Sequence, residues 1–212
     1  MSEKLTSEQL VTMILGAAEE IKANHEMLSK LDSVVGDGDH GTAMLRVVSA
    51  ISQVIGDNKD GPIKPMLERL GWAVMGVDAG STGPLVGSFF SGMAEALEDD
   101  AQLDSAALSS MFAAGQEKVQ TITTAKPGDK TMIDALAPAV ESFVAAINKG
   151  QSVSAALQQA AMASAQGAEA TKQMQAKFGR AKNLGERTIG HADPGATSVS
   201  LIFQGFHKAF CG

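Results

Sequence analysis

Apolar residues recur every three to four positions along most of this chain, which is the spacing of one face of an α-helix. Near the N-terminus, Thr6 and Gln9 form a capping-box pattern ahead of an apolar face that begins at Leu10. A second such face spans residues 42–55, and a third follows Pro62. Each stretch predicts a helix with one side buried.

The same pattern continues through the middle of the chain. A fourth predicted helix follows Pro84, and a fifth begins after Asp104, whose side chain suits an N-cap. A sixth follows Gly128 and contains Pro138, which should bend the helix or mark a late start.

Two further helices complete the prediction. The seventh runs from Val153 to about Phe178 and is rich in Ala and Gln. The last begins at Asp193-Pro194, an N-cap followed by proline at the first helical position, and runs to about Phe210. No segment alternates as a strand does, so the sequence predicts an all-α bundle of about eight helices.

Composition agrees with this fold class and excludes several functions. Aromatic residues make up 4% of the chain and tyrosine is absent, which disfavours strands. The net charge of −7 and the scattered basic residues argue against nucleic-acid and anionic membrane surfaces. A lone cysteine, Cys211, excludes an internal disulfide framework.

Residues 1–5 lack the pattern of a signal peptide, and no apolar run approaches the roughly 20 residues of a membrane span. We expect a single domain over residues 1–212 in a cytoplasmic protein.

The segment between the first two predicted helices concentrates negative charge. Asp32, Asp37 and Asp39 lie within eight residues, and no basic residue lies among them. Carboxylates this close repel one another unless a cation holds them. Hard oxygen ligands ahead of a helix N-terminus suit Mg²⁺ together with phosphate. The alternative is a solvated turn that caps a helix.

The acidic segment does not match an EF-hand. Counted from Asp37, that motif requires an oxygen ligand, a glycine and a glutamate where this chain has Gly41, Thr42 and Val48. Charge counting favours two ions, since three carboxylates and a nucleoside diphosphate carry about six negative charges and two Mg²⁺ supply about four positive ones.

Other segments offer weaker signals. His40 has three possible interpretations: a phosphate ligand, a phosphorylated nucleophile or a helix-cap residue. The segment Gly80-Ser81-Thr82-Gly83-Pro84 reads as a phosphate cradle or an ordinary turn, and it is no P-loop because no Gly-Lys-Ser/Thr follows. Arg180 is suited to clamp a phosphate with two hydrogen bonds. The Asp193-Pro194-Gly195 turn is equally compatible with a purely structural role.

Four blocks, taken in order, resemble the L subunit of dihydroxyacetone kinases, the nucleotide-binding component of those enzymes. The resemblance covers nearly the whole chain. The blocks are Gly36-Asp37-Gly38-Asp39-His40-Gly41, Gly80-Ser81-Thr82-Gly83-Pro84, Lys126-Pro127-Gly128-Asp129-Lys130-Thr131-Met132 and the segment 185–198.

The resemblance implies a barrel of eight antiparallel helices with ADP and Mg²⁺ bound in loops at one end. The implied metal ligands are Asp32, Asp37 and Asp39. The implied nucleotide-binding residues are His40, Gly41, Thr42, Ala43, Ser81, Thr82, Thr123, Met132, Arg180, Asp193, Pro194 and Gly195. Ala43 stands where the family usually has asparagine, and Thr123 stands where relatives often have glycine.

The resemblance also implies partners and a reaction. A separate K subunit binds dihydroxyacetone, and a phosphohistidine protein rephosphorylates tightly bound ADP in the phosphoenolpyruvate-dependent branch. The free-standing chain and the Asp-His-Gly form of its loop favour that branch. Two Mg²⁺ would neutralise the transferring phosphoryl group, and Arg180 would act as a catalytic residue by electrostatic stabilisation. The alternatives are the L subunit of an ATP-dependent kinase for a short ketose such as a tetrulose, and a non-catalytic nucleotide-binding adaptor. A homodimer is left open.

Overall fold

The computed structural model describes residues 3–57, 61–98 and 103–212, and in these ranges it contains eight α-helices and no strand. The sole β-like feature there is an isolated bridge between Lys4 and Asp104. The all-α prediction is confirmed. The sequence shows no signal-peptide pattern in residues 1–5. Of these, Met1 and Ser2 lie outside the described residues. The helices are α1 (Ser7–Val35), α2 (His40–Gly56), α3 (Ile63–Met75), α4 (Thr82–Glu95), α5 (Ser105–Ile122), α6 (Ile133–Asn148), α7 (Val153–Ala170) and α8 (Pro194–Cys211).

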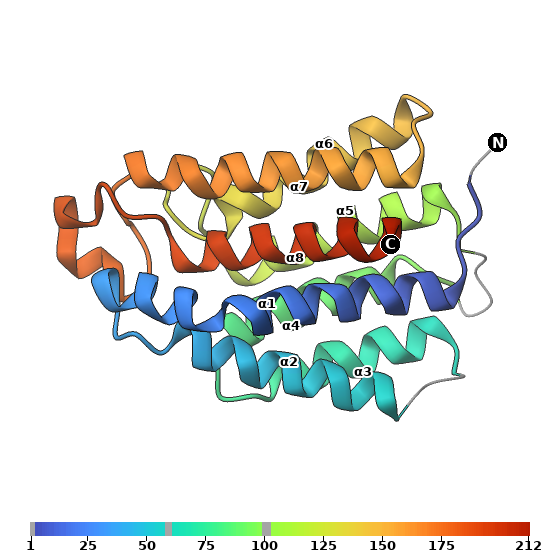
Figure 1. The fold of residues 1–212 in the computed structure, drawn as a ribbon, viewed down its shortest axis with the longest axis horizontal. Helices are drawn as coiled ribbons and strands as arrows, with labels where there is room; N and C mark the ends of the chain where they lie inside the picture. The colour runs from blue at the N-terminus through green and yellow to red at the C-terminus, as the bar shows by residue number, and fades with distance from the viewer. Residues whose placement is uncertain (1–2, 58–60, 99–102) are drawn as a thin grey trace.

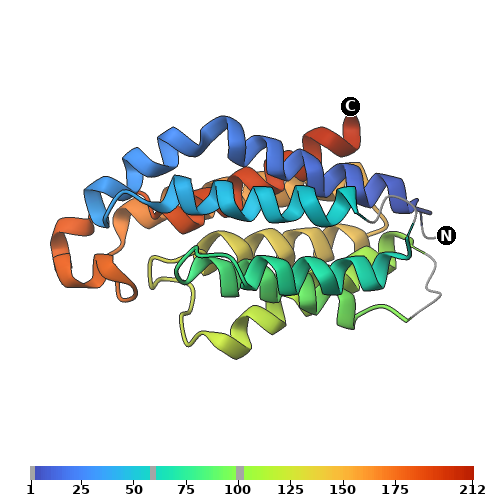
Figure 2. The same ribbon diagram turned by 90° about the horizontal axis from the view of Figure 1, so that it is seen from below.

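The helices form a closed antiparallel barrel. Each helix packs against the next one in the chain, and α8 packs against α1 to close the ring. Consecutive helices run in opposite directions, and both termini lie at the right-hand end of Figure 1. Figure 2 shows the same barrel from below, with α2 across the front. The predicted barrel is therefore confirmed.

Aromatic side chains fill the centre of the barrel. Phe112 of α5 lies with its ring centroid 4.8 Å from that of Phe143 on α6 and 5.7 Å from those of Phe203 and Phe206 on α8. These four side chains are fully buried. Because burying aromatic rings provides a large hydrophobic contribution, this cluster ties the two sides of the barrel together.

The helix boundaries follow the predicted capping residues at three points. Thr6 and Gln9 form the reciprocal capping box at α1, and the side chains of Asp104 and Asp193 accept hydrogen bonds from the first turns of α5 and α8. Other boundaries differ from the prediction. α1 continues to Val35, and α2 begins at His40.

The later helices differ as well. α4 begins at Thr82, ahead of Pro84, because proline is tolerated in a first turn. α7 ends at Ala170 rather than near Phe178, since the following backbone bonds elsewhere: the Ala176 amide donates to Thr188 Oγ1 at 3.0 Å.

Pro138 lies inside α6, which begins at Ile133, so it marks no late start. A proline cannot donate to the carbonyl four residues earlier, here that of Asp134. The backbone of Gly167 in α7 packs on that carbonyl so closely that a Cβ at Gly167 would lie 2.0 Å from the oxygen. The glycine therefore lets α6 and α7 approach at the place where the proline alters the hydrogen-bond pattern.

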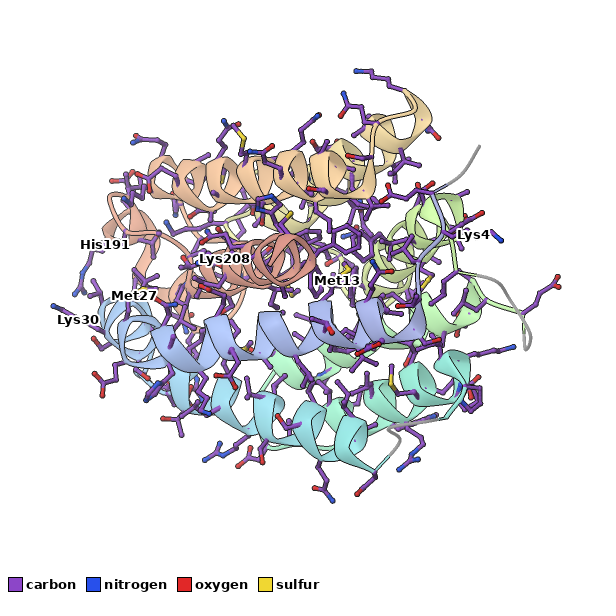
Figure 3. All side chains as sticks on the ribbon, turned by 45° about the vertical axis from the view of Figure 1, so that its right-hand side comes forward. Lys4, Met13, Met27, Lys30, His191 and Lys208 are labelled. Carbon is purple, nitrogen blue, oxygen red and sulfur yellow. The ribbon has the colours of Figure 1, made fainter. Side chains whose placement is uncertain are left out.

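The antiparallel order places four connections at one end of the barrel: residues 36–39, 76–81, 123–132 and 171–193. These are the segments in which the predicted site residues cluster, and they lie at the left of Figure 1. Figure 3 places Met27, Lys30 and His191 at this end and Lys4 at the other. None of the helices in the described ranges combines the length and hydropathy needed to cross a bilayer.

Candidate functional site

A cavity of about 400 Å³ opens at the end of the barrel where the four connections meet. This volume lies in the usual range of small-molecule pockets. The cavity brings together thirteen of the fifteen predicted residues, namely Asp32, Asp37, Asp39, His40, Ala43, Ser81, Thr82, Thr123, Met132, Arg180, Asp193, Pro194 and Gly195. Gly41 and Thr42 are absent from its lining.

Asp32 lies in the last turn of α1 rather than in the loop, and it organises the turn that follows. Its Oδ2 accepts hydrogen bonds from the amides of Gly38 at 2.9 Å and His40 at 3.3 Å. Gly36 packs against the same carboxylate, and Gly38 has a φ of 80°, which favours glycine. The glycines thus let the chain curl back over Asp32.

The curl brings the three carboxylates together. One oxygen from each of Asp32, Asp37 and Asp39 lies within 4.8 Å of the others. Asp32 is half-buried, whereas Asp37 and Asp39 are exposed. Arg180 pairs with Asp37 and lies 3.9 Å from Asp39. A set of carboxylate oxygens this close fits a hard divalent cation, and the guanidinium shows that the cluster faces positive charge across the cavity mouth.

His40 begins α2 and ties it to α8. Its Nε2 lies 2.7 Å from Oγ of Ser198, and the imidazole is buried. Burial lowers the pKa of His40, while the nearby Asp32 charge opposes that shift. The side chain therefore links the starts of α2 and α8.

Gly41 and Thr42 follow in the first turn of α2. A Cβ at Gly41 would lie 1.9 Å from the carbonyl oxygen of His25, so this glycine permits α1 and α2 to touch. Thr42 is exposed. Amides in a first helical turn have no acceptor within the helix, so these two residues can offer backbone N–H groups to an anion.

The start of α4 forms the second rim of the cavity. Ser81 and Thr82 lie at this start, and the residue before the helix makes no side-chain cap. Arg46 of α2 donates to the carbonyl of Asp78 at 2.7 Å, which holds the preceding loop. The Thr82 amide donates to the carbonyl of Ala79 at 3.0 Å, whereas the hydroxyls of Ser81 and Thr82 lie in the lining of the same cavity as the acidic cluster.

The loop before α6 is held from below by a buried carboxylate. Asp134 accepts hydrogen bonds from the amides of Gly128 at 2.5 Å and Thr131 at 2.8 Å. Asp129 binds Lys177 at 2.6 Å, and this contact lowers the pKa of the Asp129 carboxyl. The loop is thereby joined to residues 171–193, and Met132 is placed on the cavity wall.

Asp193, at the start of α8, has a carboxyl group with a raised pKa. Asp193 caps the helix by accepting from the Ala196 amide at 2.6 Å. Burial raises the pKa of Asp193 to about 7, although the bond from Ala196 and the charge of Lys130 oppose the shift. Asp193 is half-buried, and its amide donates to Thr171 Oγ1 at 2.8 Å, where residues 171–193 return to the barrel.

Sequence reasoning missed two residues that the structure brings into the cavity lining. Ser198 was noted only as part of a block, and its partner His40 lies 158 positions away. Lys130 is buried, and its Nζ donates to the carbonyls of Thr171 and His191. The sequence carries no periodic signal for either contact, since both join distant segments.

The remaining wall is apolar. It includes side chains from α2, α4, α6, α8 and the segment after α7, namely Met44, Leu85, Val86, Ile133, Phe178, Val199 and Ile202. The cavity thus combines an acidic cluster that fits cations, four helix starts that favour anions, and an apolar surface. This combination suits a ligand with phosphates at one end and a flat apolar ring at the other.

Comparison with known proteins gives a consistent picture. A family model described as the DAK2 domain matches residues 34–208. The chain is 37% identical over 200 residues to "PEP-dependent dihydroxyacetone kinase, ADP-binding subunit DhaL" of Escherichia coli (strain K12), covering 94% of this chain and 95% of that protein. It is 34% identical to "PEP-dependent dihydroxyacetone kinase 1, ADP-binding subunit DhaL" of Listeria innocua, covering 88% of each chain.

A solved structure supports the fold. The dihydroxyacetone kinase of C. freundii in its native form superposes with a TM-score of 0.75 at 24% identity. The match covers 98% of this chain and 35% of the larger one. The likeness extends over the whole helical barrel.

Proposed function

The chain belongs to the DAK2 domain family, and from that membership we propose that it is the ADP-binding subunit of a phosphoenolpyruvate-dependent dihydroxyacetone kinase. The proposal rests on one observation above all: the acidic cluster, four helix starts and an apolar wall meet in one cavity. The near-complete coverage of the relatives named as ADP-binding subunits agrees with it.

The acidic cluster is the proposed metal site. Asp32, Asp37 and Asp39 would hold two Mg²⁺, because their charge with that of a nucleoside diphosphate is about −6 and a single ion would leave strong repulsion at short range. Bound Mg²⁺ would neutralise the phosphates and hold the transferring phosphoryl group in line. Asp32 also positions the other two carboxylates by fixing the turn at Gly38 and His40.

The nucleotide would span the cavity. The amides at the starts of α2 and α4, with the hydroxyls of Ser81 and Thr82, would bind the phosphates. Ala43, Thr123, Met132 and the Asp193-Pro194-Gly195 turn would surround the nucleoside, beside the apolar wall. Arg180, already facing Asp37 and Asp39, would place a fixed positive charge beside the phosphoryl group.

The reaction needs two partners in this proposal. A phosphohistidine protein would donate a phosphoryl group to bound ADP, and the group would pass to dihydroxyacetone held on a K-type subunit. The cavity would supply the nucleotide and metal ligands, so the pocket that selects the ketose would belong to the partner. A homodimer and a cytoplasmic location stay predictions.

The first test identifies what the protein carries. Purified protein is dialysed and denatured, and the released nucleotide is separated by chromatography. We expect about one ADP per chain. A protein that holds no nucleotide after dialysis, and binds none in the presence of Mg²⁺, would contradict the proposal.

A second test separates the enzyme from a nucleotide-binding adaptor. The chain is mixed with a K-type subunit, the phosphohistidine donor and either dihydroxyacetone or erythrulose. We expect phosphorylation of dihydroxyacetone that requires all three proteins. Transfer to erythrulose but not to dihydroxyacetone would assign a different ketose acceptor. Tight ADP binding without transfer to either ketose would favour a non-catalytic nucleotide-binding adaptor.

A further inference from the structure

Residues 171–193, which we call the flap, leave the barrel after α7 and return at α8. Figure 1 shows this segment beyond the helix ends, in orange. Its two ends meet at residues 171–172 and 190–193, which we call the neck. The Asp193 amide donates to Thr171 Oγ1 at 2.8 Å, and the Gly190 amide donates to the carbonyl of Lys172 at 2.7 Å. The flap carries Arg180, so the geometry of the neck limits where that guanidinium can reach.

Lys130 lies under this neck, although it belongs to the loop before α6. Its side chain is buried, with 2% of the residue exposed. Its Nζ donates to the carbonyl of Thr171 at 2.6 Å and to the carbonyl of His191. One ammonium group therefore binds both ends of the flap, at positions 20 residues apart in the chain.

The backbone at Lys130 is unusual as well. Its φ is 59°, the only positive φ at a non-glycine residue in the described ranges. Such conformations persist where the surroundings impose them, and they cluster at functional sites. Burial lowers the pKa of Lys130, and the carboxylates of Asp193 and Asp134 oppose that shift.

We infer that Lys130 is a positioning residue that closes the neck of the flap and thereby holds Arg180 and the Asp193-Pro194-Gly195 turn over the nucleotide cavity. The inference rests on the proposed function for its effect on nucleotide, but the neck itself is a property of the described structure. Lys130 acts through two backbone carbonyls, not by touching the phosphates. Its loss should therefore loosen the flap while leaving the barrel closed.

The main test replaces the ammonium and keeps the length of the side chain. In Lys130→Met, hydrogen exchange of the Gly190 and Asp193 amides should accelerate at least tenfold, and ADP should dissociate at least tenfold faster. The matched control is Lys182→Met, which removes an exposed lysine from the flap itself. Wild-type exchange and wild-type ADP dissociation in Lys130→Met would overturn the inference.

A double-mutant cycle separates positioning from general stability. If Lys130 acts by placing Arg180, then adding Lys130→Met to Arg180→Ala should slow transfer little further. The pair Lys182→Met and Arg180→Ala should give additive effects. Fully additive losses for the Lys130 pair would contradict a positioning role.

A second variant keeps the inference testable if Lys130→Met does not fold. Thr171→Val removes the acceptor for the Asp193 amide but keeps the volume and the branched side chain. It should accelerate the same two amides even if Lys130→Met does not fold, and unchanged exchange would count against a closed neck. The exchange measurements use protein without added nucleotide. They therefore test whether the neck is held closed even if the proposed ADP site is wrong.

Discussion

His40 Nε2 and Ser198 Oγ lie 2.7 Å apart and join the starts of α2 and α8 across 158 positions of sequence. Both groups are buried. The contact holds two helix starts side by side at the cavity, so the positions of the Asp39 and Pro194 backbones depend on each other. Ser198 also donates toward the carbonyl of Pro194 at 3.1 Å, within its own helix.

Ser198→Ala should destabilise the protein by about 1–3 kcal/mol, because it removes the hydroxyl that lies 2.7 Å from a buried imidazole nitrogen. The control is Ser164→Ala, since Ser164 Oγ is buried without a hydrogen-bond partner and its removal should be neutral or stabilising. Urea unfolding of both variants measures the difference. Equal midpoints for the two alanine variants would show that the His40 contact contributes nothing.

Asp37→Asn should weaken Mg²⁺-dependent ADP binding about tenfold or more, which is about 1.4 kcal/mol, while the fold is kept. The side chain is exposed, so its removal leaves no cavity. Asp57→Asn, an exposed acid at the end of α2, is the control. Calorimetric titration with ADP, with and without Mg²⁺, measures the change. Retained tight binding in Asp37→Asn would remove this residue from the metal ligands.

Arg180→Ala should lower the rate of phosphoryl transfer by about 10²–10³-fold, the usual loss when one electrostatic stabiliser is removed. The Arg180 side chain is 66% exposed, so the melting temperature should hardly change. Arg187→Ala removes another exposed arginine of the flap and should leave turnover near wild type. A wild-type rate in Arg180→Ala would exclude a catalytic role.

Asp193→Asn should change how stability depends on pH. The pKa of Asp193 is raised to about 7 from the usual 3.8, so the folded state binds more protons than the unfolded state between these values. The stability that this group contributes is therefore present below about pH 4 and is lost as the pH rises to about 7. Asparagine keeps the N-cap and does not titrate.

The measurement is the melting temperature of both proteins from pH 4 to pH 8. The advantage of Asp193→Asn over the wild type should grow with pH by a few degrees, since about 1 kcal/mol shifts the melting temperature by about 2–4 °C at this chain size. A constant difference across this range would mean that the Asp193 carboxyl titrates normally.

Gly41→Ala should destabilise the barrel by about 1–3 kcal/mol, because the added methyl group would meet the carbonyl of His25 at 1.9 Å. Gly56→Ala in the same helix adds the same methyl group where no atom lies within 4 Å. It should be neutral or slightly stabilising. Similar melting temperatures for the two variants would show that α1 and α2 can separate without cost at Gly41.

The class of fold follows from local patterns in the amino-acid sequence. Apolar faces at helical spacing, with capping residues such as Thr6, Asp104 and Asp193, are local signals, and local hydrogen bonds suffice to realise them. The acidic spacing of Asp32, Asp37 and Asp39 likewise predicted a cluster, because short glycine-containing segments keep such residues close. Helix boundaries differ from the prediction where tertiary hydrogen bonds replace helical ones, as after Ala170.

The way in which these parts meet depends on how whole helices pack in the barrel. The antiparallel order of the barrel brings residues 36–39 and 171–193 to one mouth, and it is there that Arg180 faces Asp37. Lys130 and Ser198 gained their partners in the same way, through contacts with segments distant in the chain. Such contacts depend on the packing of whole helices, and no local pattern of residues encodes them.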